Sequence, residues 1–420
     1  MTLLFQSVTI IDAQSKHHEQ VVDVLVKNGI IDSIKPTIKA TKYDKVITGH
    51  HLHLSPGLFD MQVNFRDPGF DWKEDLSTGI DCAAKGGITG VLYMPSNHPI
   101  TDNKVHVEYI VNASKNALVD IVPAGAISKQ HEGKDLTEMF DMSQSGAKAF
   151  TDDRRSVQNA NLMKLALQYS QLFDSTIMNQ PNDCAISNKG LMNEGVISTT
   201  LGLKAIPALA EEIMLARDIE LLEYTGGKLH VNRISTRKSV ESIRMAKQKG
   251  LNISCDVAIH NLILDDSYCQ EFDTNYKVFP PLRTPDDISA LIEGLKDGTI
   301  DAICSDHCPE DVEHKVRVFE HAEFGIIGSQ TLLALACQLE KQLGITTIIN
   351  ALSHNPRRIL GLAPVKIEEG QAANLCCFDQ QSPWQYTLES NASKSTNSPF
   401  IGQTFETKVV GVVNRTRSHF

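Results

Sequence analysis

The sequence predicts an α/β fold, namely a (β/α)8 barrel with a small β-sandwich domain built from both termini. Apolar runs of strand length alternate with amphipathic runs of helix length through the middle of the chain, and both ends are rich in short strand-like runs. A length of 420 residues is enough for one barrel and a smaller appendage. We therefore expect a composite β domain of residues 1–56 plus 365–420 and a barrel domain of residues 57–364.

The elements follow in order along the chain. Before Pro56-Gly57, the strand-like runs are LLFQSVTII, VVDVLV, GIIDSI after the turn pair Asn28-Gly29, and KVITG. The barrel strands are expected at LFDMQV, ITGVLYM, DIVPAGAI, AKAFT, TIMNQ, KLHVNRI, NISCDVA and DAICSD. Helical patterns such as residues 206–225 and 239–249 separate them. NLCCFD and TKVVGVV return to a strand pattern, and the run ESNASKSTNSPF between them is expected to be a loop.

Composition narrows the class of protein. A net charge of −11 and a mean hydropathy of −0.17, with no leader pattern and no run of about 18 apolar residues, predict a soluble cytoplasmic protein that does not enter membranes. The absence of a long Lys/Arg block argues against a nucleic-acid partner. The nine cysteines are scattered, so we expect reduced thiols; Cys304 and Cys308 approach metal spacing but lack the second pair that structural zinc requires.

Polar residues recur where the predicted barrel strands end. The pairs are Gln62 and Asn64, Ser96 and Asn97, Asp152 and Asp153, Asn179 and Gln180, Asn232 and Arg233, and Asp306 and His307. Taken alone, each pair is typical of the polar residues that commonly end a strand. Because active sites of this fold lie at the carboxyl ends of the strands, their recurrence predicts a polar pocket at the barrel mouth.

A series of motifs carries a family resemblance. PGLFDMQVNFRDPG, GGITGVLYMPSNHPITDN, FTDD, GLMNEGVISTTLGLKAIPALAEE, LHVNRISTRKSVE, KVFPPLRT, DGTIDAICSDHCPE, FGIIGSQT and EEGQAANLCCFD resemble, in order and spacing, the class I dihydroorotases of the cyclic amidohydrolase superfamily. The resemblance implies a TIM-barrel amidohydrolase that interconverts dihydroorotate and N-carbamoyl-aspartate in pyrimidine synthesis. Its active members use zinc to activate a hydroxide and an aspartate to move the proton.

The same resemblance places the metal-ligand positions of the family on residues that are mostly poor ligands. The family's four histidines fall at Gln62, Asn64, Gln180 (or Asn179, if the match slips by one residue) and Arg233. Its two carboxylates are kept as Asp153 and as Asp306, which holds the general-base position. Amides are poor zinc ligands, and arginine offers donors only. We therefore expect no metal and no other cofactor.

The substrate positions of the family are altered as well. Arg66, the carboxylate clamp, is kept. Four other positions of the resemblance have changed, to Ser96, Phe279, Glu310 and Glu323. The two new acids should repel an acidic substrate.

Histidines elsewhere leave alternatives open. His51 and His53 form a literal HxH, but they precede the barrel, and we expect them to face solvent or the domain boundary. His230, His260 and His307 are expected to be neutral pocket residues, with a single weak metal on Asp153, Asp306 and one of them as the alternative. We expect the Arg233 guanidinium to fill the metal position and pair with Asp153 or Asp306; a surface salt bridge is the competing interpretation.

Three functions remain in competition. The first is a non-catalytic dihydroorotase homologue with a structural or regulatory role, since the resemblance extends to inactive relatives that assemble with aspartate transcarbamoylase. The second is an active dihydroorotase, or another cyclic amidohydrolase, with an atypical or mononuclear zinc site. The third is a small-molecule sensor that uses the pocket without chemistry. In each case we expect a homo-oligomer.

Overall fold

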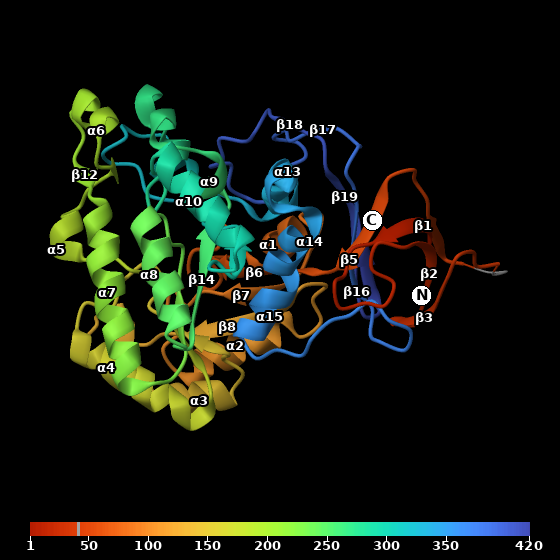
Figure 1. Ribbon diagram of the computed structural model, residues 1–420, viewed down its shortest axis with the longest axis horizontal. Helices are drawn as coiled ribbons and strands as arrows, with labels where there is room; N and C mark the ends of the chain where they lie inside the picture. Colours follow the sequence, from red (N-terminus) through yellow and green to blue (C-terminus); the bar gives the residue numbers. More distant parts are fainter. Residues whose placement is uncertain (40–42) are drawn as a thin grey trace.

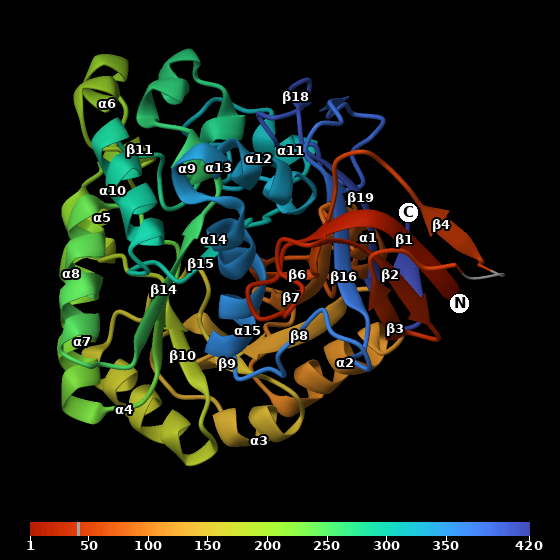
Figure 2. The same cartoon turned by 45° about the vertical axis from the view of Figure 1, so that its right-hand side comes forward.

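The computed structural model describes residues 1–39 and 43–420, and it places a barrel and a β domain side by side (Figures 1 and 2). Eight parallel strands form the barrel sheet in the order β15-β14-β13-β10-β9-β8-β7-β6. A parallel bridge between Val63 and His307 links its two edges. The strands are β6 (Leu58–Val63), β7 (Ile88–Tyr93), β8 (Asp120–Gly125), β9 (Ala149–Phe150), β10 (Thr176–Asn179), β13 (Leu229–Val231), β14 (Ile253–Ala258) and β15 (Ala302–Cys304). The predicted fold class is confirmed.

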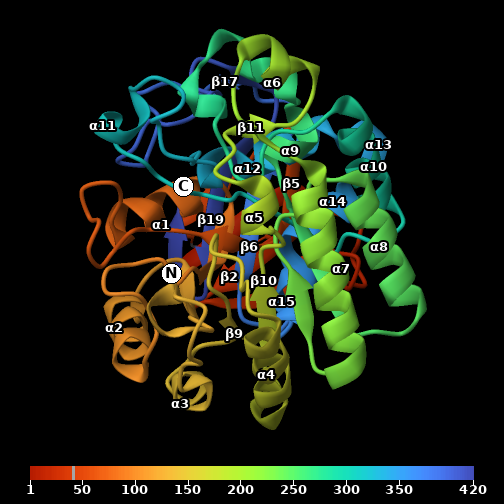
Figure 3. The same ribbon diagram turned by 90° about the vertical axis from the view of Figure 1, so that its left-hand side faces the viewer.

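Helices cover the outside of the barrel, as α2, α3, α4, α7 and α8 do in Figure 3. Most of the longer ones begin at an Asp, Asn or Thr whose side chain accepts a hydrogen bond from the first turn, as Asp75, Asn103, Asn159, Thr236 and Thr284 do. The longer helices are α1 (Leu76–Lys85), α2 (Lys104–Ser114), α3 (Met139–Gln144), α4 (Ala160–Ser170), α7 (Ala208–Thr225), α8 (Arg237–Gln248), α10 (Pro285–Lys296) and α12 (Leu332–Gln338).

Short helices occupy the connections between these elements. They are α5 (Cys184–Ser187), α6 (Val196–Leu201), α9 (His260–Ile263), α11 (Val312–Lys315), α13 (Glu340–Leu343), α14 (Ile345–Ile349) and α15 (Asn355–Ile359). Across the described residues, no helix has the length and apolar character needed to cross a membrane.

The β domain joins the two ends of the chain, and both termini lie on its side of the molecule (Figure 1). Its sheet runs β20-β19-β16-β5-β1-β2-β3, with β4 paired to β1, and the antiparallel pair of β5 and β16 connects the N-terminal and C-terminal strands. Asn28 and Gly29 both have positive φ in the turn between β2 and β3, as a tight hairpin requires. The strands are β1 (Thr2–Ile10), β2 (Val21–Lys27), β3 (Ile30–Lys35), β4 (Lys45–Ile47), β5 (Leu52–Pro56), β16 (Asn374–Asp379), β19 (Lys408–Asn414) and β20 (Arg417–His419).

Part of the C-terminal region packs against the barrel. Tyr386, Phe400 and Phe405 belong to the barrel core, and the short strands β17 (Trp384–Gln385) and β18 (Thr404–Phe405) pair with each other. A second short pair, β11 (Met192–Asn193) and β12 (Ala205–Ile206), lies in a barrel loop. Residues 389–398, here called the strap, make up most of the Ser/Asn-rich run 389–400 that we expect to be a loop. They carry no helix or strand, yet several of their side chains are buried.

Candidate functional site

Four residues beyond the barrel strands share an unusual backbone conformation. Arg66, Asp153, Arg233 and Asp306 all have positive φ, at 64°, 52°, 49° and 50° respectively. For a residue with a side chain, this left-handed conformation costs about 1 kcal/mol or more and is concentrated at functional sites. Each follows a barrel strand, so the four mark one built site at the barrel mouth.

The Arg233 guanidinium lies at the centre of this site and is fully buried. Nη1 donates to Asp306 Oδ1 at 2.6 Å, and Nη2 donates to Asp153 Oδ1 at 3.1 Å. Nε donates to Gln180 Oε1 at 2.8 Å. One cation therefore contacts both carboxylates that the resemblance assigns to metal binding, so a surface salt bridge for Arg233 is ruled out in this structure.

The amide residues complete the network around this cation. Asn64 Nδ2 donates to Asp153 at 3.4 Å, and Gln62 Nε2 donates to Asp256 at 3.0 Å. Asn179 instead donates to Asp218 at 2.6 Å. The geometry therefore favours Gln180 over Asn179 as the residue at this position of the resemblance, because Gln180 faces Arg233.

Two charged residues of the site were not identified from the sequence. Arg154 Nη2 donates to Asp306 Oδ2 at 2.7 Å, and fully buried Asp256 accepts from the backbone N–H of Arg233 at 2.5 Å and faces His230. Signals for both were present. Arg154 directly follows the FTDD motif, and Asp256 is an acid inside the predicted barrel strand NISCDVA.

Electrostatics favour the ionised forms of Asp153 and Arg233. Burial acts to raise the pKa of Asp153, but Arg233 and then Arg154 hold that pKa below its usual value. Burial likewise opposes the charge on Arg233, while Asp306 and Asp153 raise its pKa. A buried charge is tolerated when it is paired and hydrogen-bonded, as all of these are.

The donor set does not fit zinc. Gln62 Oε1 and Asn64 Oδ1 are buried without a hydrogen-bond partner among the described residues, but amide oxygens suit hard cations better than zinc. Both carboxylates are already bonded to arginine. In the described ranges 1–39 and 43–420, no group of three or more His, Cys, Asp or Glu side chains is arranged to hold a metal.

The histidines are placed apart from one another. His230 contacts Ser254 at 2.8 Å and Asp256 at 3.1 Å. His307 Nε2 lies 3.6 Å from Glu74 Oε2. Burial lowers the pKa of His260 to about 4, which keeps its imidazole neutral.

The literal HxH motif lies outside the barrel. His53 is in β5, paired with β1 and β16, and its ring stacks on Phe378 with centroids 5.3 Å apart. His51 precedes that strand and is exposed. Neither histidine is part of the strand-end site.

A cavity of about 520 Å³ opens in front of the Arg233 cluster. Its lining includes five positions singled out from the sequence, namely Arg66, Ser96, Phe279, Glu310 and Glu323. Ser96 donates to Asp153 at 2.8 Å, and the rings of Phe279 and Phe324 meet edge to face at 5.8 Å. Glu310 is not the free negative charge that the sequence suggested, because it pairs with Arg66 and Lys73.

The fold of this chain recurs in solved hydantoinase structures. Among solved structures, L-hydantoinase (dihydropyrimidinase) from Arthrobacter aurescens matches with a TM-score of 0.85 over 99% of this chain and 95% of its own, at 20% identity. A D-hydantoinase from Thermus sp. matches with a TM-score of 0.81 at 21% identity, over 99% of this chain and 94% of its own. At such identities the likeness concerns the fold alone.

Sequence relatives are more specific. The family model described as "Dihydro-orotase-like" matches residues 52–239. A protein named dihydroorotase from Acetivibrio thermocellus is 42% identical over 91% of this chain and 90% of its own length, and one from Ruminiclostridium cellulolyticum is 40% identical over 96% and 94%. This chain belongs to the dihydroorotase family.

Proposed function

We propose that this chain is a non-catalytic member of the dihydroorotase family with a structural or regulatory role in pyrimidine biosynthesis. The carrying observation is the buried Arg233 guanidinium, which bonds to Asp153 and Asp306 at 3.1 and 2.6 Å. It supplies positive charge between two carboxylates without offering a lone pair or a water-binding coordination site. Hydrolysis of a cyclic amide by the family's chemistry needs an activated hydroxide, which this arrangement does not generate.

The residues around Arg233 support the same proposal. Gln62, Asn64 and Gln180 form amide hydrogen bonds with their neighbours. Asp306, at the proton-transfer position of the resemblance, bonds to Arg233 and Arg154. Both oxygens of this carboxylate are therefore occupied by guanidinium donors, Oδ1 by Arg233 and Oδ2 by Arg154.

The proposed role includes assembly with other chains. The family resemblance motivates a homo-oligomer and a complex with aspartate transcarbamoylase, the preceding enzyme of the pathway. In such a complex this chain would contribute its folded frame rather than turnover. We place it in the cytoplasm.

A second candidate is an active dihydroorotase, or another cyclic amidohydrolase, with an atypical or mononuclear zinc site. The names and identities of the relatives, 42% and 40%, favour it. In this version Asp306 would carry the proton and Arg66 would clamp the substrate carboxylate. Metal would require Asp153, Asp306 and a histidine to converge, and Arg233 would have to leave both carboxylates.

One experiment separates the two candidates. The purified chain is analysed for bound zinc and assayed for dihydroorotate hydrolysis and for ring closure of N-carbamoyl-aspartate, with the Acetivibrio thermocellus relative as positive control. We expect substoichiometric zinc and no turnover above background, with or without added zinc. Stoichiometric zinc together with turnover would overturn the proposal and establish the second candidate.

A frame control accompanies this assay. It combines Gln62→His, Asn64→His, Gln180→His and Arg233→His, which restores all four imidazoles of the resemblance. Zinc binding by this variant, but not by the wild type, would show that the frame is sound and that the side chains alone prevent metal binding.

A further inference from the structure

Arg66 and Glu310 of the cavity lining form an ion triad with Lys73, which the proposed function leaves unexplained. Arg66 Nη2 donates to Glu310 Oε1 at 2.6 Å, and Lys73 Nζ donates to Glu310 Oε2 at 2.5 Å. Within the described residues, no other carboxylate lies within 4.0 Å of either cation. Each oxygen of one internal carboxylate therefore serves one cation, and the triad carries one net positive charge.

The triad is closed rather than open to solvent. Glu310 is 6% exposed and Lys73 is 9% exposed. The other Arg66 contacts are also internal, since Nε donates to Pro309 O at 3.1 Å and Nη2 approaches Cys308 Sγ at 2.9 Å. A buried carboxylate with two charge-assisted bonds is costly to displace, because the departing charge would have to be rehydrated or paired elsewhere.

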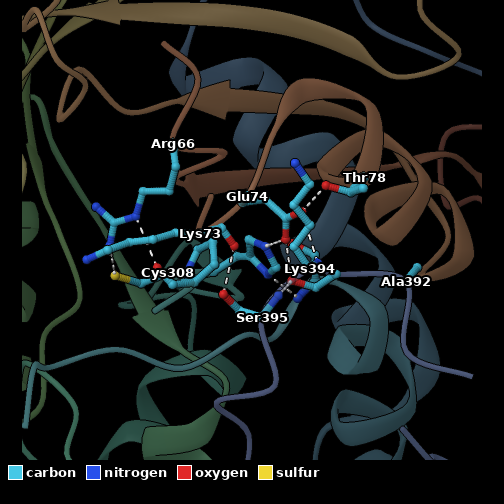
Figure 4. A network of polar contacts seen from close by, with 12 residues as sticks. Arg66, Lys73, Glu74, Thr78, Cys308, Ala392, Lys394 and Ser395 are labelled. Carbon is cyan, nitrogen blue, oxygen red and sulfur yellow. Dashed lines mark hydrogen bonds and ion pairs between the residues drawn. The ribbon is translucent and has the colours of Figure 1, made fainter. Parts of the chain in front are cut away.

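The strap fixes this carboxylate from behind. Asn397 Oδ1 accepts from the backbone N–H of Glu310 at 3.1 Å, and Asn397 Nδ2 donates to Cys308 O at 3.1 Å. Ser395 Oγ donates to Lys73 O at 2.7 Å. Figure 4 shows the polar network extending from Arg66 and Cys308 at one end to Thr78 and Ala392 at the other, with Ser395 and Lys394 of the strap inside it.

Buried Glu74 strengthens the same attachment. Its carboxylate accepts from Ser393 Oγ and from the backbone N–H of Lys394, the latter at 3.2 Å. The loop that carries Lys73 and the loop that carries Glu310 are therefore both held by one segment from the C-terminal region. Glu310 is positioned by built contacts and not by a chance surface conformation.

We propose that Glu310 acts as an internal carboxylate ligand of Arg66 and Lys73, fills the anion-binding end of the cavity, and makes the pocket select against small molecules that carry a carboxylate. A ligand carboxylate could reach these cations only by displacing Glu310. A ligand of the same shape without a carboxylate has no such requirement. This inference rests on the proposed function, since a catalyst acting on dihydroorotate would need this end of the pocket free.

Two ligands that differ by one carboxylate test the selectivity. L-dihydroorotate and dihydrouracil share the ring, and only the first carries the acid. Isothermal titration calorimetry on the full-length wild type should show no preference for dihydroorotate. Glu310→Ala should bind dihydroorotate about tenfold or more tighter than dihydrouracil, because a charge-assisted hydrogen bond contributes at least about 1.5 kcal/mol, or one order of magnitude in affinity.

Matched variants keep this test decisive. Glu323→Gln removes an exposed acid from the same cavity and should leave the preference unchanged, whereas Arg66→Met added to Glu310→Ala should abolish the gain. Glu310→Ser also vacates this space, and it replaces Glu310→Ala if thermal melts show that the alanine variant does not fold. The inference is overturned if the wild type prefers dihydroorotate, if a folded Glu310 variant gains no preference, or if Glu323→Gln gains as much.

The outcome is distinguishable from failure of the proposed function. Turnover is followed separately, and turnover by the wild type contradicts the non-catalytic role whatever the binding preference is. A wild type that prefers dihydroorotate without turning it over contradicts only the role of Glu310. Turnover by Glu310→Ala is not expected, because Arg233 still occupies the centre of the site.

Discussion

Replacing Arg233 by methionine should strongly destabilise the chain. The guanidinium is fully buried and bonds to Asp306 at 2.6 Å and to Asp153 at 3.1 Å. Methionine fills similar space without charge, so both carboxylates lose their shared cation. Deleting one partner of a buried ion pair costs about 3–5 kcal/mol, because an uncompensated charge remains.

The magnitude can be refined from the remaining partners. Asp306 keeps Arg154 at 2.7 Å, whereas Asp153 keeps, among the described residues, only the neutral side-chain donors Ser96 and Asn64. We therefore expect a loss near the lower end, about 3 kcal/mol in the free energy of unfolding. Adding Asp153→Asn removes the stranded charge, so the double variant should be more stable than Arg233→Met alone.

Urea denaturation followed by circular dichroism measures these differences. Arg155→Met is the matched control, since the neighbouring arginine is exposed and should shift stability by no more than about 0.5 kcal/mol. The folded-state pKa of Asp153 lies below its unfolded value, so its contribution is present above about pH 4 and is lost as pH falls. The difference in the free energy of unfolding between wild type and Arg233→Met should therefore become smaller at acidic pH. A difference in the free energy of unfolding below about 0.5 kcal/mol at pH 7 would refute the claim that Arg233 forms a stabilising buried ion pair.

Two further predictions concern the surroundings of the site. Burial lowers the pKa of His260 to about 4, whereas the pKa of histidine in an unfolded chain is about 6.5. Between these two pH values the unfolded state therefore binds more protons than the folded state. The free energy of unfolding should fall by on the order of 3 kcal/mol as pH drops from about 6.5 to 4. Urea unfolding at pH 4.5 and 7 should show that the free energy of unfolding depends less on pH for His260→Gln than for wild type. The exposed His321→Gln is the control. An equal pH dependence for His260→Gln and wild type would contradict the lowered pKa of His260. Asn397→Ala removes the hydrogen bonds to Glu310 N–H and Cys308 O and should cost about 2 kcal/mol in the same assay. Thr396→Ala changes an exposed neighbouring residue and should leave the free energy of unfolding unchanged. Equal losses of stability in the two variants would indicate that the hydrogen bonds of Asn397 contribute little.

Several features of the site could be predicted because they depend on residue type and strand position. Successive side chains of a strand point to opposite faces, and active sites of barrels lie at the carboxyl ends of the strands. Polar residues at the end of a predicted barrel strand therefore indicate which side chains reach the barrel mouth. The absence of imidazoles at Gln62, Asn64, Gln180 and Arg233, with two acids left, pointed to a paired arginine, since two buried carboxylates need a cation. Which oxygen each guanidinium nitrogen would meet was not accessible, because it depends on the backbone at positive φ.

Other features could not be read from the chain. Glu310 looked like an added repulsive charge, yet it is neutralised by Arg66, 244 positions away, and by Lys73. The strap looked like an ordinary polar loop, yet Asn397 and Ser395 bond to residues of two barrel loops. A serine-rich run carries no periodic signal for such docking, because its hydrogen bonds form with partners brought near only by folding.

The sequence by itself determined the barrel, the family and the absence of histidine at the four positions where the resemblance expects it, because hydrophobic period and residue identity are local properties. Only the tertiary structure decided that Arg233 joins both Asp153 and Asp306, and that Glu310 pairs with Arg66. These contacts link residues 73 to 244 positions apart. Charges at such separations meet through the packing of the barrel, and the energy of each pair depends on burial and geometry that no local pattern specifies.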